Sequence, residues 1–539
     1  MDKMTYDYII IGAGPAGLQL GYYFQKAGLN YVILEATETA GAFFRDFPRH
    51  RMLISINKVH TGYDDPNINL RWDWNSLLSD GDEDPLLFKS FSQKYFPDAN
   101  VMVEYLSEYA RRQNLNIEFN SRVSRIDKAD RFEIECESGA KHSAKVVVVA
   151  TGTPLPQVAD IPGIEHVECY TTVSVDPNDF AGQRVLILGK GNSAFETADN
   201  LIGTTSLIHV ASPETVKMAW QSHYVGHLRA VNNNFLDTYQ LKSQNAALDA
   251  TISYILKDGD KYHVGINYSN LDEEEEIVYD RVIACTGFRF DPSYFGESCR
   301  PELTIDNRFP RQSAIWESTN VPDLYFAGSI MQSRDFKKTQ SAFVHGFRYN
   351  VRLLSRLLQQ KYEDVPLMPT TFDVCPMELA RRTLHRVNTN SGLWQQNGFL
   401  CDVIAIDNDR SSARYFEELS CDYVREIWAR DESDYFQLTM NFGMEKIKSV
   451  RNVFAIPRPN KEDVSRASES AAMHPIIEHY RNGERVSVHH VIEDLTAEWK
   501  EPRHFDPLAE YFQRELSTPP APKMHSKSNR TPSTAAMAK

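Results

Sequence analysis

The 539-residue sequence predicts a doubly wound α/β protein followed by a separate α+β domain. Over roughly the first 360 residues, strand-like apolar runs alternate with segments of helical spacing. A strand, a glycine turn and a helix follow one another twice, in "YDYIIIGAGPAGLQL" and in "RVLILGKGNSAFETA". After about Lys361 these units stop, and "PMELARRTLHRV", "SSARYFEELSCDYVREIW" and "HPIIEHYRNG" indicate amphipathic helices mixed with short strands.

Charge and cysteine usage limit the class of protein. The formal net charge of -15 argues against a nucleic-acid partner, because binding a phosphate backbone needs a positive field. Seven dispersed cysteines without a CxxC pair indicate free thiols in a reducing compartment. No apolar run approaches the ~20 residues of a membrane span, and neither a secretory signal nor a KDEL-type end is evident. We therefore expect a cytoplasmic protein without a metal site.

The first glycine turn predicts a dinucleotide site. In "IIIGAGPAG" the three glycines have GxGxxG spacing, follow a buried strand and open a helix. Gly12 allows the tight turn, Gly14 lets the backbone approach a pyrophosphate, and Gly17 lets the helix pack closely on the strand. Glu35 ends the next strand and is placed to accept hydrogen bonds from an adenosine ribose. Pro15 and Ala16 complete the predicted phosphate-binding turn at the helix N-terminus.

Two later motifs indicate that the ligand of this first site is FAD. "VVVVATG" (146–152) and "NVPDLYFAGS" (320–329) resemble the paired motifs of flavoproteins whose FAD domain is split by an inserted NAD(P) domain. We expect Thr151 and Gly152 of the first motif, and Gly328 and Ser329 of the second, to contact FAD.

The second glycine turn lies between these two motifs and predicts the pyridine-nucleotide site. "GKGNSAFETA" resembles the GxGxSAxE turn of flavin-containing monooxygenases and thioredoxin-reductase-like proteins. Its predicted contacts are Gly189, Gly191, Asn192, Ser193 and Ala194. The following strand offers no decisive cation, so the choice between NADH and NADPH stays open. Two such sites in one chain predict hydride transfer from NAD(P)H to FAD.

These patterns predict two Rossmann-like domains and an accessory domain. We expect an FAD domain from residues 1–165 and 285–360 and an inserted NAD(P)H domain from residues 166–284. We expect an α+β accessory domain over residues 361–516. Residues 517–539, rich in Ser, Pro and Ala, are predicted to be a disordered tail.

Longer stretches point to one particular family. "GAFFRDFPRHRMLISINKVHTG", "LRWDWNSLL", "HYVGHLRAVNNNFLDTYQLKS", "SGLWQQNGFLCDV" and "VHHVIEDLTAEW" resemble the FAD-dependent oxidoreductase domain-containing protein 2 group, also called the endoplasmic-reticulum flavoprotein associated with degradation. The wider resemblance, carried by "YFPDANVMVEYLSEYARRQNLNIEFNSRVSRI", is to class B flavin-containing monooxygenases.

The resemblance implies residues around the flavin. It implies that Asn57 lies near the reactive edge of the ring, with Arg51 and Lys58 supplying positive charge, so that these three are the predicted catalytic residues. The implied FAD contacts are Gly41, Phe44, Arg45, Val123 and Gln340.

The monooxygenase fingerprint FxGxxxHxxx(Y/F/W) is altered in this chain. His166 of "IPGIEHVECYTTVSVDP" stands one position early, and Tyr170 and Ser174 fall near the expected places of the histidine and the aromatic residue.

The leading functional hypothesis is an FAD-dependent NAD(P)H oxidoreductase that uses molecular oxygen to oxygenate a small organic substrate. The alternative is a flavin-bearing redox or interaction partner of other proteins, which docks through the accessory domain without oxygenating small molecules. A flavin-dependent disulfide reductase is disfavoured, because no cysteine pair lies near a motif. The sequence predicts neither the substrate nor the oligomeric state.

Overall fold

The computed structural model describes residues 3–240, 245–450 and 452–518. Its first sheet has the strand order β3-β2-β1-β6-β5-β4, and β18 also pairs with β6. Strands β1, β2, β3, β6 and β18 run parallel, whereas β4 and β5 are antiparallel. These strands are β1 (Met4–Ile11), β2 (Tyr31–Leu34), β3 (Ile117–Glu118), β4 (Val123–Lys128), β5 (Phe132–Cys136), β6 (Lys141–Val149) and β18 (Leu324–Phe326).

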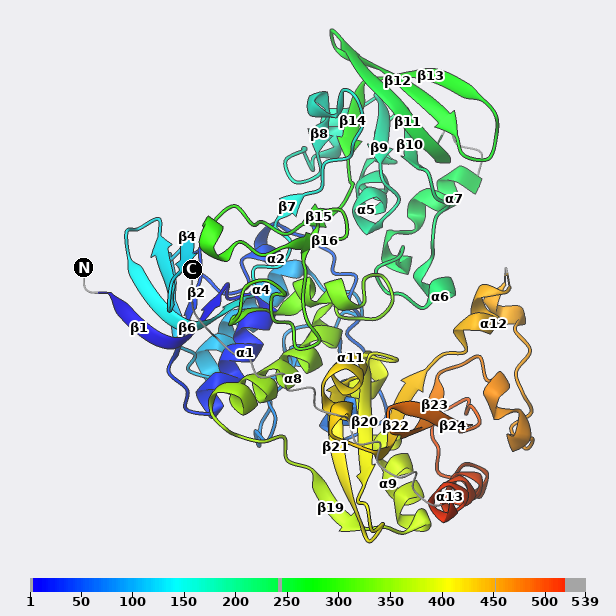
Figure 1. The fold of residues 1–539 in the computed structure, drawn as a ribbon. Helices are drawn as coiled ribbons and strands as arrows, with labels where there is room; N and C mark the ends of the chain where they lie inside the picture. The colour runs from blue at the N-terminus through cyan, green and yellow to red at the C-terminus, as the bar shows by residue number, and fades with distance from the viewer. Residues whose placement is uncertain (1–2, 241–244, 451, 519–539) are drawn as a thin grey trace, which may run out of the picture.

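Helices α1 and α8 pack against each other beside this first sheet (Figure 1). Strand β1 ends in four buried residues, Tyr8–Ile11, which is expected of a parallel strand covered on both faces. The helices of this region are α1 (Pro15–Lys26), α2 (Phe43–Asp46), α3 (Pro66–Asn69), α4 (Ala99–Arg112) and α8 (Val344–Tyr362). The short hairpin of β16 (Leu303–Thr304) and β17 (Phe309–Pro310) lies between β15 and β18 in the chain.

The second sheet has the order β13-β12-β11-β10-β9-β14-β8. Its strands are β8 (Glu168–Cys169), β9 (Arg184–Leu188), β10 (Leu207–Ser212), β11 (Ala246–Asp258), β12 (Lys261–Tyr268), β13 (Glu274–Tyr279) and β14 (Arg281–Ala284). Helices α5 (Asn192–Leu201), α6 (Ala219–Ser222) and α7 (Asn234–Gln240) belong to it. The chain enters through β7 (Leu155–Pro156) and leaves through β15 (Phe288–Arg289), which pair with each other.

The third sheet is wholly antiparallel, with the order β19-β21-β20-β22-β23-β24. Its strands are β19 (Thr370–Asp373), β20 (Leu400–Ile406), β21 (Ser412–Ser420), β22 (Asp434–Asn441), β23 (His474–Arg481) and β24 (Glu484–His490). Helices α9 (Pro376–Thr389), α10 (Gly392–Gln395), α11 (Cys421–Glu426), α12 (Met444–Lys448) and α13 (Pro502–Ser517) accompany it. The segment "HPIIEHYR" forms strand β23, because its ladder with β22 buries alternate side chains.

Two parallel-strand sheets with glycine turns and a third antiparallel α+β unit confirm the predicted fold class. Helix α13 continues to Ser517, and residues 519–539 of the predicted tail lie outside the described residues. Within the described ranges, no helix is both long and apolar enough to span a bilayer.

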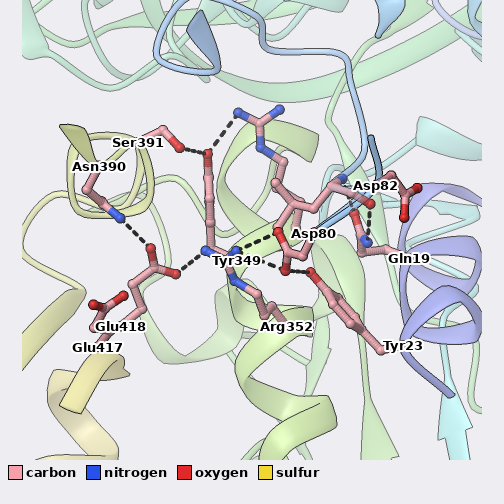
Figure 2. Close-up of polar contacts among 12 residues, drawn as sticks. Gln19, Tyr23, Asp80, Asp82, Tyr349, Arg352, Asn390, Ser391, Glu417 and Glu418 are labelled. Carbon is pink, nitrogen blue, oxygen red and sulfur yellow. Dashed lines mark hydrogen bonds and ion pairs between the residues drawn. The ribbon is translucent and has the colours of Figure 1, made fainter. Parts of the chain in front are cut away.

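A partly buried polar network connects the third sheet to helix α8 (Figure 2). Arg352 of α8 donates to Asp80 at 2.9 Å and also pairs with Glu418 of β21. Tyr23 of α1 donates to the same Asp80 at 2.8 Å. Tyr349, one turn before Arg352, donates to Ser391 Oγ at 2.6 Å. Charge-assisted bonds of this kind hold the two units in one orientation.

Candidate active site

A cavity of about 930 Å³ lies where the carboxyl ends of the first sheet meet the second glycine turn. This volume is at the upper end of the ~300–1,000 Å³ usual for ligand sites. Its lining comes from both glycine turns, from the segment around α2 and from the start of α8. Because residues of both Rossmann-like units share this cavity, two ligands bound at the two turns can meet in it.

The first glycine turn has the backbone that a pyrophosphate needs. Gly12 has φ of +102°, and a Cβ there would lie 3.0 Å from the carbonyl oxygen of Ala150. A Cβ on Gly17 would lie 1.9 Å from the carbonyl oxygen of Gly12, so only glycine lets α1 approach the end of β1. Gly14 borders the cavity, and a Cβ there would meet no protein atom within 4 Å. No side chain caps α1, so its first N–H groups remain available to an anion.

Glu35 is buried at the end of β2 and borders the cavity. Its Oε2 accepts a hydrogen bond from the backbone N–H of Ala13 at 2.7 Å. Its Oε1 accepts from the backbone N–H of Thr37 at 2.9 Å and from the Thr37 hydroxyl at 3.0 Å. These bonds fix the carboxylate, and Oε2 keeps a second acceptor position for a ligand hydroxyl.

The other predicted FAD contacts divide into two groups. Those that line the cavity are Pro15, Ala16, Phe44, Val123, Thr151, Gly152, Gly328 and Ser329. Gly17, Gly41, Arg45 and Gln340 do not line it. Gly41 packs against Leu106, and Arg45 pairs with Glu38. Gln340 is buried toward the third sheet, and its N–H donates to Gln396 Oε1 at 3.1 Å.

The second glycine turn repeats the plan of the first. Gly189 has φ of +114°, and a Cβ there would lie 2.3 Å from the carbonyl oxygen of Cys285, whereas Gly191 is open. Asn192 and Ser193 start α5 and line the cavity, and Ala194 is buried in the core below them. Asn192 Nδ2 donates to the carbonyl oxygen of His227 at 2.9 Å, which fixes the neighbouring loop.

The three predicted catalytic side chains are not brought to the cavity. Arg51 has φ of +68° and donates to Asn100 Oδ1 at 2.8 Å and to the carbonyl oxygen of Arg45 at 3.1 Å. Asn57 is buried, and its amide donates to the carbonyl oxygen of Ser92 at 2.7 Å. Lys58 is exposed over the Trp72 ring at 5.9 Å. In this structure the three side chains therefore contact other parts of the protein near residues 51–58 and do not border the cavity.

The same segment does reach the cavity through other residues. Phe47, Pro48, Leu53, Ile54 and Ser55 line it, so the prediction that this stretch passes the site is consistent with the geometry although the named side chains differ. These residues are mostly apolar, and apolar walls exclude water from a hydride-transfer site.

A buried Tyr170–Glu196 pair lines the cavity and is not among the predicted site residues. Glu196 is the acid of the second glycine motif, and it accepts a hydrogen bond from the Tyr170 hydroxyl. The Tyr170 oxygen in turn accepts from the backbone N–H of Arg49 at 3.2 Å. Burial raises the pKa of Glu196 to about 7, although the bond from Tyr170 acts in the opposite direction. The position of Tyr170 near the expected fingerprint histidine was the available signal.

We expect Glu196→Gln to remove a pH dependence of stability. The folded-state pKa of Glu196 is raised, so the stability it contributes is present below pH 4.5 and is lost as the pH rises through about 7. A shift of this size corresponds to a few kcal/mol, on the order of 3. Apparent Tm values from pH 5 to pH 8 should show the variant gaining relative to the parent as the pH rises. Parallel curves would contradict the assignment.

Comparisons with known proteins agree with this geometry. Residues 9–328 match the pyridine nucleotide-disulphide oxidoreductase family, which defines the class of the chain. FAD-dependent oxidoreductase domain-containing protein 2 of Mus musculus is 37% identical over 565 residues, covering 95% of this chain and 84% of its own. The chain belongs to the family of that protein. This membership confirms the predicted family and implies FAD and NAD(P)H as cofactors.

More distant similarities include an oxygenase, a ferredoxin–NADP reductase and a solved monooxygenase structure. Senecionine N-oxygenase of Tyria jacobaeae is 26% identical over 337 residues, which cover 59% of this chain and 66% of that protein. The solved flavin-containing monooxygenase from Stenotrophomonas maltophilia has a TM-score of 0.52 at 21% identity. The alignment covers 66% of this chain and 99% of the monooxygenase chain. At this identity, the similarity supports the fold and not the function.

The residues present fit these cofactors. The open space at Gly14, the uncapped α1 and the fixed Glu35 provide a place for a phosphate and a ribose. Thr151, Gly152, Gly328 and Ser329 of the two later motifs border the same cavity, as expected of residues that contact the cofactor.

Proposed function

We propose that this protein is an NAD(P)H-dependent flavin monooxygenase that oxygenates a small organic substrate. The observation that carries the proposal is that one cavity is bordered by residues of both glycine motifs. FAD, when bound, would take up hydride from NAD(P)H and deliver electrons to the acceptor.

The chain's own residues would bind, orient and exclude water. Glycine turns would hold the two nucleotides, and apolar residues such as Leu53 and Phe47 would keep water from the space between them. The Tyr170–Glu196 pair would provide a proton site that titrates near neutrality at the same cavity.

Oxygen is favoured over a disulfide as the electron acceptor. No cysteine is among the described residues that line the cavity, although the chain belongs to a family named for disulfide chemistry. All seven cysteines are free, which also supports the proposed location in the cytoplasm.

The test is a stoichiometry measurement. Holoprotein is supplied with NADPH or NADH, oxygen and a panel of amines, thioethers and ketones, and nucleotide oxidised, peroxide released and oxygenated product are quantified. We expect oxygenated product in proportion to nucleotide oxidised. Peroxide without any oxygenated product would contradict the proposal and favour the redox-partner alternative.

A matched pair of variants controls this test. Gly189→Ala should keep its flavin but lose reduction by NAD(P)H, because the new Cβ would meet the Cys285 carbonyl. Gly191→Ala, with no atom within 4 Å of its new Cβ, should keep the fold of the turn. Product formation that persists in Gly189→Ala would show that the second turn is not the nucleotide site.

A further inference from the structure

The third sheet's unit contacts the second sheet's unit through two pairs of aromatic rings. His223, the residue after α6, stacks on Phe442 with ring centroids 4.4 Å apart and planes inclined by 26°. Trp220 of α6 stacks on Phe454 with centroids 5.3 Å apart and planes inclined by 13°. Phe442 directly follows strand β22, and Phe454 belongs to the helical turn Val453–Ala455. Helices α6 and α12 accordingly lie side by side (Figure 1).

Helix α6 lies within a loop, residues 217–232, whose two arms are bonded to each other. The backbone N–H of Leu228 donates to the carbonyl oxygen of Lys217 at 2.9 Å. The Ser222 Oγ and His227 Nδ1 atoms are hydrogen-bonded at 2.6 Å. Because these bonds join the arm that carries α6 to the arm that follows it, a contact at the end of α6 restrains both arms of the loop.

The second arm of this loop holds Asn192 at the second glycine turn. Asn192 Nδ2 donates to the carbonyl oxygens of Gly226 at 3.2 Å and His227 at 2.9 Å. Its Oδ1 accepts from the backbone N–H of Arg229 at 3.0 Å and from the side-chain amide of Asn232 at 3.2 Å. Asn192 is the first residue of α5 and lines the cavity. The loop therefore sets the direction of a side chain at the nucleotide turn.

The backbone around Phe442 is fixed within the third sheet's unit. The N–H of Phe442 donates to Asn441 Oδ1 at 2.9 Å. The N–H of Gly443 donates to the carbonyl oxygen of Ala471 at 3.1 Å. A Cβ on Gly443 would lie 2.1 Å from the carbonyl oxygen of Ser470, so the two segments are in close contact. The ring of Phe442 is therefore presented to the loop from a fixed position.

We propose that Phe442 is a positioning residue for the pyridine nucleotide. Stacked on His223, it holds the loop 217–232, and through that loop it holds Asn192 in the direction that a nucleotide at the second glycine turn requires. The third sheet's unit thus supports the nucleotide site from outside the cavity lining. This role goes beyond the proposed function, because it concerns nucleotide binding and holds for any electron acceptor.

Anaerobic stopped-flow reduction of the holoprotein tests the proposal. Flavin absorbance is followed while NADPH, and separately NADH, is varied, which gives an apparent Kd and a limiting rate of reduction. For Phe442→Ala we expect the Kd of the nucleotide that reduces the flavin to rise roughly threefold to tenfold, as expected for the loss of one aromatic pair. The limiting rate should stay within about twofold of the parent, because the ring acts on binding and lies outside the cavity lining. Phe442→Tyr should keep the parent's Kd, because it keeps the ring.

The matched control is Phe372→Ala, which removes another half-buried ring of the same unit, on strand β19 beside Arg382. It should keep the parent's Kd. A rise equal to that of Phe442→Ala would overturn the proposal, because it would show a general effect of loosening the third sheet's unit.

His223→Asn tests the same ring contact from the loop side. Asparagine tolerates the positive φ of +56° at this position, so the variant removes the ring without straining the backbone. It should raise the Kd as Phe442→Ala does, and it decides the matter alone if Phe442→Ala loses its flavin. The double variant should bind no more weakly than the weaker of the two single variants. Additive losses, or an unchanged Kd in His223→Asn, would overturn the proposal.

Discussion

Gly17→Ala should yield a protein without FAD. The new Cβ would lie 1.9 Å from the carbonyl oxygen of Gly12, a backbone atom that cannot turn aside as a side chain can. Helix α1 would have to move away from β1, and its N-terminal N–H groups would leave the phosphate position. We expect a cost above ~3 kcal/mol, since overpacking at a rigid contact exceeds ordinary core strain. The flavin-to-protein absorbance ratio and the apparent Tm measure the effect.

Gly14→Ala is the matched control for that experiment. It lies in the same turn, but its Cβ would meet no protein atom within 4 Å. We expect this variant to keep the parent's circular dichroism and to bind FAD more weakly, because its methyl group would enter the cavity. A Gly17→Ala protein with full flavin content would contradict the assigned close approach of α1 and β1.

The sequence predicted those features that local backbone geometry dictates. The two glycine turns are examples. Gly12 and Gly189 have positive φ values, which glycine adopts most readily, so the turns can be recognised from the spacing of their glycines. The buried run that ends β1 likewise reports a strand covered on both faces. In both cases the residues that indicate the structure lie in the same short segment as the turn or strand that they form.

The catalytic role of Asn57, Arg51 and Lys58 stays a prediction, because it rests on resemblance and not on local backbone geometry. Asn57 is implied by resemblance, but the direction of its amide depends on Ser92, which is 35 positions away. Cavity residues such as Trp74 and His345 meet only because α8 returns to the first sheet after the second unit. No hydrophobic period or motif spacing in the sequence predicts that tertiary contact. The acid Glu196 lies inside the second glycine motif, yet its raised pKa follows from burial beside Tyr170, which is a tertiary property.

Arg352→Leu should loosen the third sheet from the rest of the molecule. Arg352 joins Asp80 to Glu418, and Arg352 and Asp80 are 272 positions apart in the chain. Burial would raise the pKa of Glu418, but Arg352 and Arg386 overcome this and lower it to about 2. Without Arg352 a buried carboxylate loses its main partner (Figure 2), and breaking a buried pair costs about 3–5 kcal/mol.

Urea unfolding and limited proteolysis would measure that loss. In Arg352→Leu we expect the third-sheet unit to unfold at a lower urea concentration than in the parent, with cleavage appearing between α8 and β19, where the chain passes to the third sheet. Arg381→Leu is the control, because Arg381 pairs with Glu378 on the exposed side of α9. Exposed pairs of this kind contribute less than ~1 kcal/mol. Equal losses in the two variants would show that the network in Figure 2 does not hold the sheets together, and that their apolar contact alone does.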